Sequence, residues 1–212
     1  MQGIIPPLIT PLLDQDTLDT EGMERLVQHV LAGGVHGLFI LGTTGEGPSL
    51  SYRLRRELIE LVCRQVDRRV PVVVGITDTA FVESVDLSRH ASDHGAAAVV
   101  AATPYYFPAG QPELIEYFTH LSKQVALPLV LYNMPGCTKL TLTHQTVVRL
   151  MDLPGVVGLK DSSGDMAEFH RLLEMTKARE GFDLLIGSEQ LLAESVLFGA
   201  AGGVCGGANL EP

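Results

Sequence analysis

The stretch GVVGLKDSSGD, residues 155–165, has the pattern of a short buried strand that ends on a lysine and turns directly into a polar loop. Its apolar half is too short for a helix and lacks alternation, which is typical of strands covered on both faces in parallel sheets. The lysine, Lys160, allows two interpretations. Either its side chain leaves the core towards water, or its amine is held in an apolar interior, where lysine is rare.

Apolar runs of the same kind recur, and there are eight in all. They begin at Gly3, Gly37, Pro71, Ala96, Leu127, Gly155, Phe182 and Ala201. Segments with helical periodicity lie between them, such as residues 23–31, which stop at the helix-ending pair Gly33-Gly34. Further helices are predicted after Phe81, at Pro112, after Thr143, after Gly164 and near Glu189. This alternation predicts an α/β fold, a (β/α)8 TIM barrel, with a doubly wound open sheet as the alternative.

The length of the chain, 212 residues, fits one domain over residues 1–212. A barrel of this type typically needs about 250 residues. The sequence stops at Pro212, directly after the eighth apolar run. It therefore predicts a single (β/α)8 barrel that is C-terminally truncated after strand 8 and lacks its last helix. No Gly-x-Gly-x-x-Gly follows the first run and no loop has Walker-A spacing, so a nucleotide cofactor is not expected.

Composition argues against several classes of protein. The formal net charge is −10 and no basic cluster is longer than Arg53–Glu57, so nucleic acid is not an expected partner. The three cysteines are far apart and lack Cys-x-x-Cys spacing, which argues against a disulfide framework and a zinc site. There is no basic leader and no uncharged apolar stretch of about 18 residues, so we expect a cytoplasmic protein without membrane contact.

Two histidines have the spacing of metal ligands. His90 and His94 stand at i and i+4, which places both rings on one helical face. The helix that carries them is expected to stop at Gly95, and a helix end predicts that both rings are exposed. No metal site is therefore expected from this pair.

Polar side chains gather where the predicted strands end. They are Thr43, Thr44, Tyr105, Tyr106, Tyr132, Asn133, Lys160, Ser188 and Glu189. In a barrel these positions form the active face. Strand alternation also predicts which side chains share a face: Lys160 with Gly158 and Val156, Tyr132 with Val130, and Thr43 with Leu41 and Phe39. If that face is the interior, Asp161 lies on the opposite one and does not neutralise the lysine.

A lysine in such an interior has a defined chemical use. Its amine is a poor nucleophile while protonated, but loss of water disfavours the charged form and frees the lone pair. The free amine can condense with a keto group to give a Schiff base. The iminium accepts electrons when a carbon–carbon bond next to it breaks or forms, and a nearby tyrosine hydroxyl can carry the protons.

Four motifs occur in a fixed order at the strand ends. They are GTTGEG at 42–47, TPYY at 103–106, YNMP at 132–135 and GLKDSSGD at 158–165. Together they resemble the dihydrodipicolinate synthase and N-acetylneuraminate lyase family, and the similarity runs from PLITP at 7–11 to GGANL at 206–210. The resemblance implies pyruvate-dependent class I aldolases and related dehydratases that need no cofactor. It also implies a (β/α)8 barrel followed by a small helical C-terminal region, which this sequence lacks.

The resemblance further implies roles for individual residues. Lys160 forms the Schiff base with pyruvate or another keto acid, and Tyr132 relays protons. Thr43 and Thr44 hold the carboxylate of the keto acid and link the relay. Tyr106 matches a tyrosine that reaches into the site of a neighbouring subunit, which implies a homo-tetramer or homodimer. Gly187 and Val204 match positions near the substrate. Ser188, Glu189 and Ser162 are expected to bind substrate through the hydroxyls of a sugar acid.

The expected activity is that of a lyase that makes or cleaves a carbon–carbon bond of a 2-keto acid. Dihydrodipicolinate synthases usually carry an arginine two positions after the proline of YNxP, where this sequence has Cys137. A neutral thiol offers a carboxylate only one weak donor, although Lys139 is a possible substitute. The favoured substrate is therefore a 2-keto-3-deoxy sugar acid or N-acetylneuraminate, with pyruvate as a product.

Four alternatives to this activity stay open. Three are a dihydrodipicolinate synthase, a related dehydratase and a non-catalytic sensor that binds keto acids. The fourth takes the glycines at 202–207 as a cradle for phosphate, since barrels often bind phosphate after strands seven and eight. No arginine or lysine follows those glycines, which weakens this last interpretation.

Overall fold

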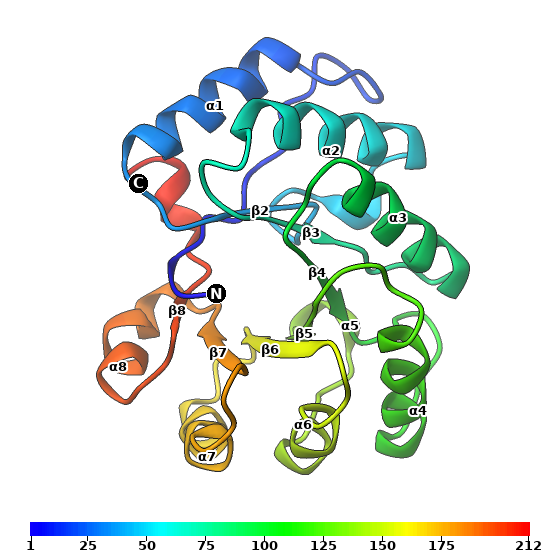
Figure 1. Ribbon diagram of the computed structural model, residues 1–212, viewed down its shortest axis with the longest axis vertical. Coiled ribbons are helices and arrows are strands. Elements are labelled where there is room, and N and C mark those ends of the chain that lie inside the picture. The colour runs from blue at the N-terminus through cyan, green and yellow to red at the C-terminus, as the bar shows by residue number, and fades with distance from the viewer.

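Strands and helices alternate along the chain in the computed structural model, which describes residues 1–212 (Figure 1). The strands are β1 (Gly3–Ile4), β2 (Leu38–Ile40), β3 (Val72–Gly75), β4 (Ala98–Ala102), β5 (Leu129–Asn133), β6 (Val156–Asp161), β7 (Asp183–Ile186) and β8 (Gly202–Gly203). The α-helices are α1 (Thr20–Ala32), α2 (Tyr52–Val66), α3 (Phe81–Asp93), α4 (Gln111–Ser122), α5 (Pro135–Thr138), α6 (His144–Leu150), α7 (Met166–Thr176) and α8 (Leu192–Leu197). Three 3-10 turns are η1 (Gly47–Ser49), η2 (Glu189–Leu191) and η3 (Gly206–Asn209).

All strand pairs are parallel, and the sheet order is β1-β8-β7-β6-β5-β4-β3-β2. The sheet closes between its two edges through a parallel bridge that joins Pro7 to Phe39. Phe39 N–H donates to Pro6 O at 3.0 Å, and Leu8 N–H donates to Phe39 O at 2.8 Å. The longer helices lie outside the ring of strands, whereas the short α5 lies beside the end of β5 (Figure 1). The predicted (β/α)8 barrel is therefore confirmed, and the open doubly wound sheet is excluded.

The predicted helix boundaries match the structure closely. Side-chain oxygens of the capping residues accept backbone N–H groups in the first turn, which fixes where four helices begin. These caps are Asp19 for α1, Ser51 for α2, Thr143 for α6 and Asp165 for α7. Helix α1 ends before Gly33 and Gly34, and Gly34 has a φ of 83°, which other residues rarely adopt. Near Glu189 the chain first forms the 3-10 turn η2, and α8 follows it.

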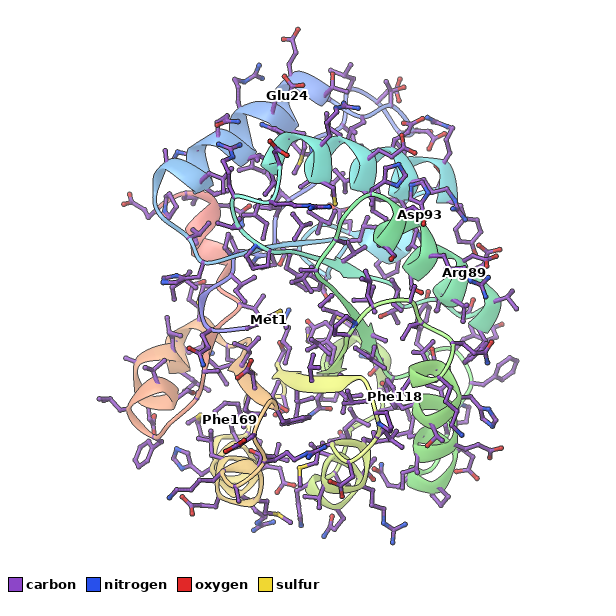
Figure 2. All side chains as sticks on the ribbon, viewed as in Figure 1. Met1, Glu24, Arg89, Asp93, Phe118 and Phe169 are labelled. Carbon is purple, nitrogen blue, oxygen red and sulfur yellow. The ribbon has the colours of Figure 1, made fainter.

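Two separate apolar cores result from strands that are covered on both faces. The larger one lies between strands and helices, and in Figure 2 Phe118 of α4 and Phe169 of α7 point into it while Glu24 and Arg89 point away. The smaller one fills the barrel interior. Its buried members are Ile5, Phe39, Val73, Ala98, Val100, Ala102, Tyr132, Val130, Leu185 and Val204. No helix of the structure is both long enough and apolar enough to cross a membrane.

The prediction that side chains alternate strictly between the two faces of each strand is wrong at two places. In β6 the pairing with β5 shifts from Leu129–Val156 to Val130–Gly158, so Val157 is an extra residue, a β-bulge. Val156 consequently packs in the outer core, and Val157 rather than Val156 packs against the interior one. Leu41, after β2, also packs outward, because its backbone turns into the left-handed region with a φ of 58°.

Candidate active site

Lys160 lies inside the barrel at the carboxyl end of β6, with 5% of its surface exposed. Its Nζ is 4.1 Å from the ring centroid of Tyr132 and 4.8 Å from that of Phe39. Asp161 faces the other way, where its carboxylate accepts Asn133 Nδ2–H at 2.7 Å and Ser163 Oγ–H at 2.7 Å. The ammonium is therefore surrounded by aromatic rings and has no carboxylate beside it.

This environment changes the acid–base behaviour of Lys160. Burial removes water from the ammonium and lowers the pKa of Lys160 from its ordinary value of 10.5. The electrostatic interaction with the neighbouring Tyr132 phenol opposes this lowering of the pKa but does not reverse it. A larger share of the side chain is then an unprotonated amine at neutral pH, and only that form attacks a carbonyl carbon.

We expect Lys160→Met to raise the free energy of unfolding, because methionine fills a similar volume without a desolvated amine. The pKa of folded Lys160 lies below the unfolded value of 10.5. At pH values between these two pKa values, the unfolded chain binds more protons than the folded chain. The free energy of unfolding of the wild type therefore increases as the pH rises through this range. The advantage of the variant is therefore full below the folded pKa and shrinks towards pH 10.5. Urea unfolding of both proteins at neutral and alkaline pH measures it, and a less stable variant at neutral pH would contradict it.

Tyr132 stands beside Lys160 on the neighbouring strand, since the two Cα atoms are partners in the β5–β6 pairing. The phenol is 6% exposed, and its hydroxyl is 3.3 Å from Thr43 Oγ1. Thr43 belongs to the loop after β2, and Thr44 follows it on the surface. A chain of two hydroxyls therefore leads from the lysine to the loop, and such a chain can pass a proton in either direction.

A cavity of about 310 Å³ opens at the carboxyl ends of β2 to β5. Its polar lining consists of Thr43, Glu46, Ser49, Thr77, Tyr105, Tyr132, Cys137 and Thr138. Glu46 is the only charged residue among all those that line it. Lys160 lines a smaller cavity of about 10 Å³ deeper in the barrel, and the two cavities share Phe39 and Val100 in their walls. Tyr132 thus lies between the lysine and the open space.

A buried ion pair holds the loops around the large cavity. Arg55 of α2 donates from Nη1 to Asp78 Oδ2 at 2.7 Å, and both side chains are almost fully buried. The same guanidinium donates to Leu50 O at 3.0 Å and to Pro48 O at 3.1 Å. The loop after β2 is therefore tied to the loop after β3, which bears Thr77.

The substrate-binding residues expected after β6, β7 and β8 lie outside the large cavity. Of this group, Val204 lines the small cavity that contains Lys160. The carboxylate of Glu189 accepts Gly207 N–H at 2.9 Å, so it braces the turn after β8. At Gly187 a Cβ would lie 1.9 Å from Ser162 Oγ, which explains the glycine there. Ser188 is half-buried directly before η2.

Tyr106 is not part of the site within one chain. It is 84% exposed, adopts a φ of 84° and packs edge-on against Phe107 at 5.0 Å. The preceding residue, Tyr105, lines the cavity instead. Tyr105 was among the polar residues predicted at the strand ends, whereas sequence reasoning missed Thr77. The signal for it was present, because Thr77 directly follows the third apolar run at a predicted strand end.

A buried lysine at the carboxyl end of strand six of a (β/α)8 barrel, beside a tyrosine hydroxyl, defines a Schiff-base-forming lyase of the class I aldolase type. The model of the Dihydrodipicolinate synthetase family matches residues 1–212. The chain belongs to this family.

Solved structures and curated relatives agree with this assignment. The structure of dihydrodipicolinate synthase from Bacteroides thetaiotaomicron is 56% identical, with a TM-score of 0.95 over 99% of this chain and 70% of that one. YagE of Escherichia coli K12, in complex with pyruvate, is 34% identical, with a TM-score of 0.96 over 100% of this chain and 72% of that one. A probable 2-dehydro-3-deoxy-D-pentonate aldolase of Escherichia coli K12 is 34% identical over 99% of this chain and 70% of its own length. This chain thus spans about seven tenths of the length of such relatives.

Proposed function

We propose that the protein cleaves a 2-keto-3-deoxy sugar acid to pyruvate and an aldehyde. The observation that carries this proposal is the charge of the large cavity, whose lining contains many hydroxyl groups and no cation. A sugar acid has one carboxylate, next to its keto group, and a tail of hydroxyls. Aspartate semialdehyde, the second substrate of a synthase, brings a carboxylate of its own, which this lining would meet with Glu46 and the thiol of Cys137.

Two cations near the cavity lining in sequence, Lys139 and Arg55, are bound elsewhere. Lys139, the possible substitute for the missing arginine, adopts a φ of 61°, and its Nζ donates to Gly136 O at 2.6 Å. It does not line the cavity. Arg55 is bound to Asp78. Losing a charge-assisted contact of this kind weakens binding by about 1.5–3 kcal/mol, roughly ten- to a hundredfold.

The proposed reaction begins when the neutral amine of Lys160 attacks the keto carbon of the substrate. Tyr132 gives its phenolic proton to the departing oxygen, so water leaves as the iminium forms. The Tyr132 phenolate then takes the proton of the hydroxyl on the fourth carbon. The bond between the third and fourth carbons breaks, its electron pair moves into the iminium, and the aldehyde leaves. The remaining enamine takes a proton from Tyr132 at the third carbon, and water then releases pyruvate from Lys160 and returns a proton to the phenolate. Thr43 and Thr44 hold the carboxylate during these steps.

We propose that a second copy of this chain completes the site with Tyr106. A large aromatic side chain that is 84% exposed at the active face is well placed for a contact between copies. The assembly is then a homodimer or a homo-tetramer.

The three cysteines are all free, which is consistent with a reducing cytoplasm.

A second candidate is dihydrodipicolinate synthase activity, which is favoured by the 56% identity with a structure of that name. Two assays with the same protein separate the candidates. One couples pyruvate release from 2-keto-3-deoxy sugar acids and N-acetylneuraminate to lactate dehydrogenase. The other follows condensation of pyruvate with aspartate semialdehyde. We expect kcat/KM for sugar-acid cleavage to exceed that for condensation by at least about tenfold, and efficient condensation without cleavage would overturn the choice.

A further inference from the structure

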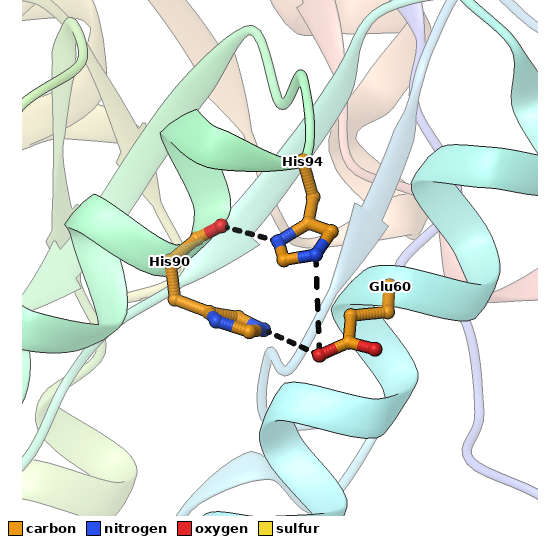
Figure 3. A group of neighbouring side chains, drawn as sticks. All are labelled: Glu60, His90 and His94. Carbon is orange, nitrogen blue, oxygen red and sulfur yellow. Dashed lines mark hydrogen bonds and ion pairs between the residues drawn. The ribbon is translucent and has the colours of Figure 1, made fainter.

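We propose that Glu60, His90 and His94 form a binding site for a divalent transition metal, Zn²⁺ in the first instance, on the outer surface of the barrel (Figure 3). Glu60 comes from the middle of α2, and the two histidines come from the last turn of α3 and its C-cap. Two imidazoles and one carboxylate are a donor set that proteins use for Zn²⁺, with water in the fourth position.

The distances between the donor atoms fit a four-coordinate ion. Bonds of about 2.0–2.1 Å at tetrahedral angles place neighbouring donor atoms about 3.3 Å apart. Glu60 Oε1 is 3.3 Å from His90 Nε2 and 3.9 Å from His94 Nε2, and the donor atoms of all three residues lie within 4.8 Å of one another. Small rotations of the side chains would bring the set to bonding geometry. Figure 3 shows both rings turned towards the same carboxylate oxygen.

A hydrogen bond prepares His94 for this role. Its Nδ1 is 2.9 Å from the carbonyl oxygen of His90, and a carbonyl can only accept. In the neutral ring the proton is therefore on Nδ1, and Nε2 presents a lone pair. This arrangement, in which the second ring nitrogen donates to a carbonyl, is the usual support of a metal-bound histidine. The lone pair of Nε2 then faces the carboxylate of Glu60, and two acceptors that face each other need a proton or a cation between them.

His90 is held more firmly than its partners. Its side chain is 15% exposed, and Nε2 lies 3.3 Å from Glu60 Oε1 and 3.3 Å from Arg56 O. Both oxygens are acceptors, so Nε2 carries a proton in the metal-free protein and gives it up when it binds an ion. The rings of His90 and His94 are in contact, with centroids 4.4 Å apart. The side chains of His94 and Glu60 are 36% and 45% exposed, so an ion can enter and water can complete its coordination. One ligand is thus fixed by packing, and two can adjust.

The place of the site in the fold suggests what a bound ion does. The three residues stand outside the strands, and none of them lines a cavity that contains Lys160 or Tyr132. Helices α2 and α3 pack against each other, and a metal bound by residues of both joins them. An ion that binds only the folded protein stabilises it by mass action, so the expected effect is on thermal stability and not on the chemistry of the barrel.

A surface ion pair between the glutamate and protonated imidazoles would give the same proximity without a metal. The chain offers matched controls for that case. His120 and Glu116 are 3.8 Å apart on α4, and His170 and Glu194 are 3.9 Å apart, each with one histidine only. If these two pairs bind Zn²⁺ as the proposed site does, the closeness of a histidine and a glutamate is enough to explain the binding, and the third ligand is not needed.

The experiment measures Zn²⁺ binding by isothermal titration and Co²⁺ binding by visible absorption. The proteins compared are the wild type, Glu60→Gln, His90→Gln, His94→Gln and the control His120→Gln. We expect one ion per chain in the wild type, intense Co²⁺ absorption typical of four-coordinate nitrogen and oxygen ligands, and a rise in Tm with Zn²⁺. Each of the three ligand variants should lose at least about tenfold in affinity and most of the rise in Tm. His120→Gln should retain both.

Three results would overturn the proposal. They are no binding of Zn²⁺ by the wild type, equal affinity in the wild type and all three ligand variants, and an equal loss in His120→Gln. Circular dichroism and pyruvate trapping by borohydride show whether each variant is folded. Glu60→Gln keeps the shape of the side chain and removes only its charge. It therefore tests the ligand even if a histidine variant fails to fold.

Discussion

Borohydride added with pyruvate is expected to fix a covalent adduct on Lys160, and Lys160→Arg is expected to abolish it. The amine of Lys160 has a lowered pKa because it is buried among the rings of Tyr132 and Phe39 without a carboxylate partner. It can therefore form an imine, which the hydride reduces to a stable amine. Arginine keeps the charge, but its guanidinium stays protonated and cannot attack a carbonyl. The expected loss of label is complete.

Peptide mapping by mass spectrometry locates the label. Lys139→Arg is the matched control, because this lysine is exposed four residues after Pro135 and its amine is hydrogen-bonded to Gly136 O. The control should label as the wild type does. A label on a lysine other than Lys160, or one that does not depend on pyruvate, would contradict the proposed role.

Tyr132→Phe is expected to leave imine formation detectable and to lower turnover by at least about 10²-fold, the lower range for loss of a positioned proton donor. Phenylalanine keeps the ring that lies 4.1 Å from Lys160 Nζ, so the surroundings of the amine change little. It removes the hydroxyl that is 3.3 Å from Thr43 Oγ1 and with it the path for protons. Borohydride trapping and steady-state turnover of the same preparation separate the two steps.

Tyr117→Phe provides the matched control for this substitution. Tyr117 lies on α4 against the outer core, and its buried hydroxyl has no hydrogen-bond partner. Loss of the Tyr117 hydroxyl should leave turnover near the wild-type value. Melting temperatures of both variants test for misfolding. Near-normal turnover in Tyr132→Phe would rule out the proton relay at this residue.

The sequence predicted the part of the site that depends on the ends of parallel strands. Lys160 and Tyr132 each follow an apolar run, and parallel strands bring their carboxyl ends to one edge of the sheet, so the two side chains meet. The sequence predicted the correct face for Lys160 from a wrong premise. Val156 was expected on the same face of the strand, but it packs in the outer core. Alternation was the correct rule only after the bulge at Val157.

Other parts of the site depend on contacts that no local pattern encodes. The tie between Arg55 and Asp78 joins two loops, and its existence depends on the rotamer of a long side chain. The contact between Glu60 of α2 and His90 of α3 likewise depends on side-chain rotamers and on the packing of two helices. The i, i+4 spacing predicted that the two histidines share a face, but the expected exposure of both was wrong for His90, which neighbouring helix α2 covers in large part.

The bulge in β6 makes the pairing of this strand with β5 a determinant of chemistry. Val156 faces the helices. With regular alternation from Val156, residue 160 would also face the helices and residue 161 would face the axis of the barrel. One inserted position reverses that parity, so the amine occupies the interior and the carboxylate of Asp161 joins Asn133 outside it. If the same residues paired regularly, without the bulge, an acid would replace the base at the centre of the barrel, whereas a chain without Val157 would keep Lys160 inside.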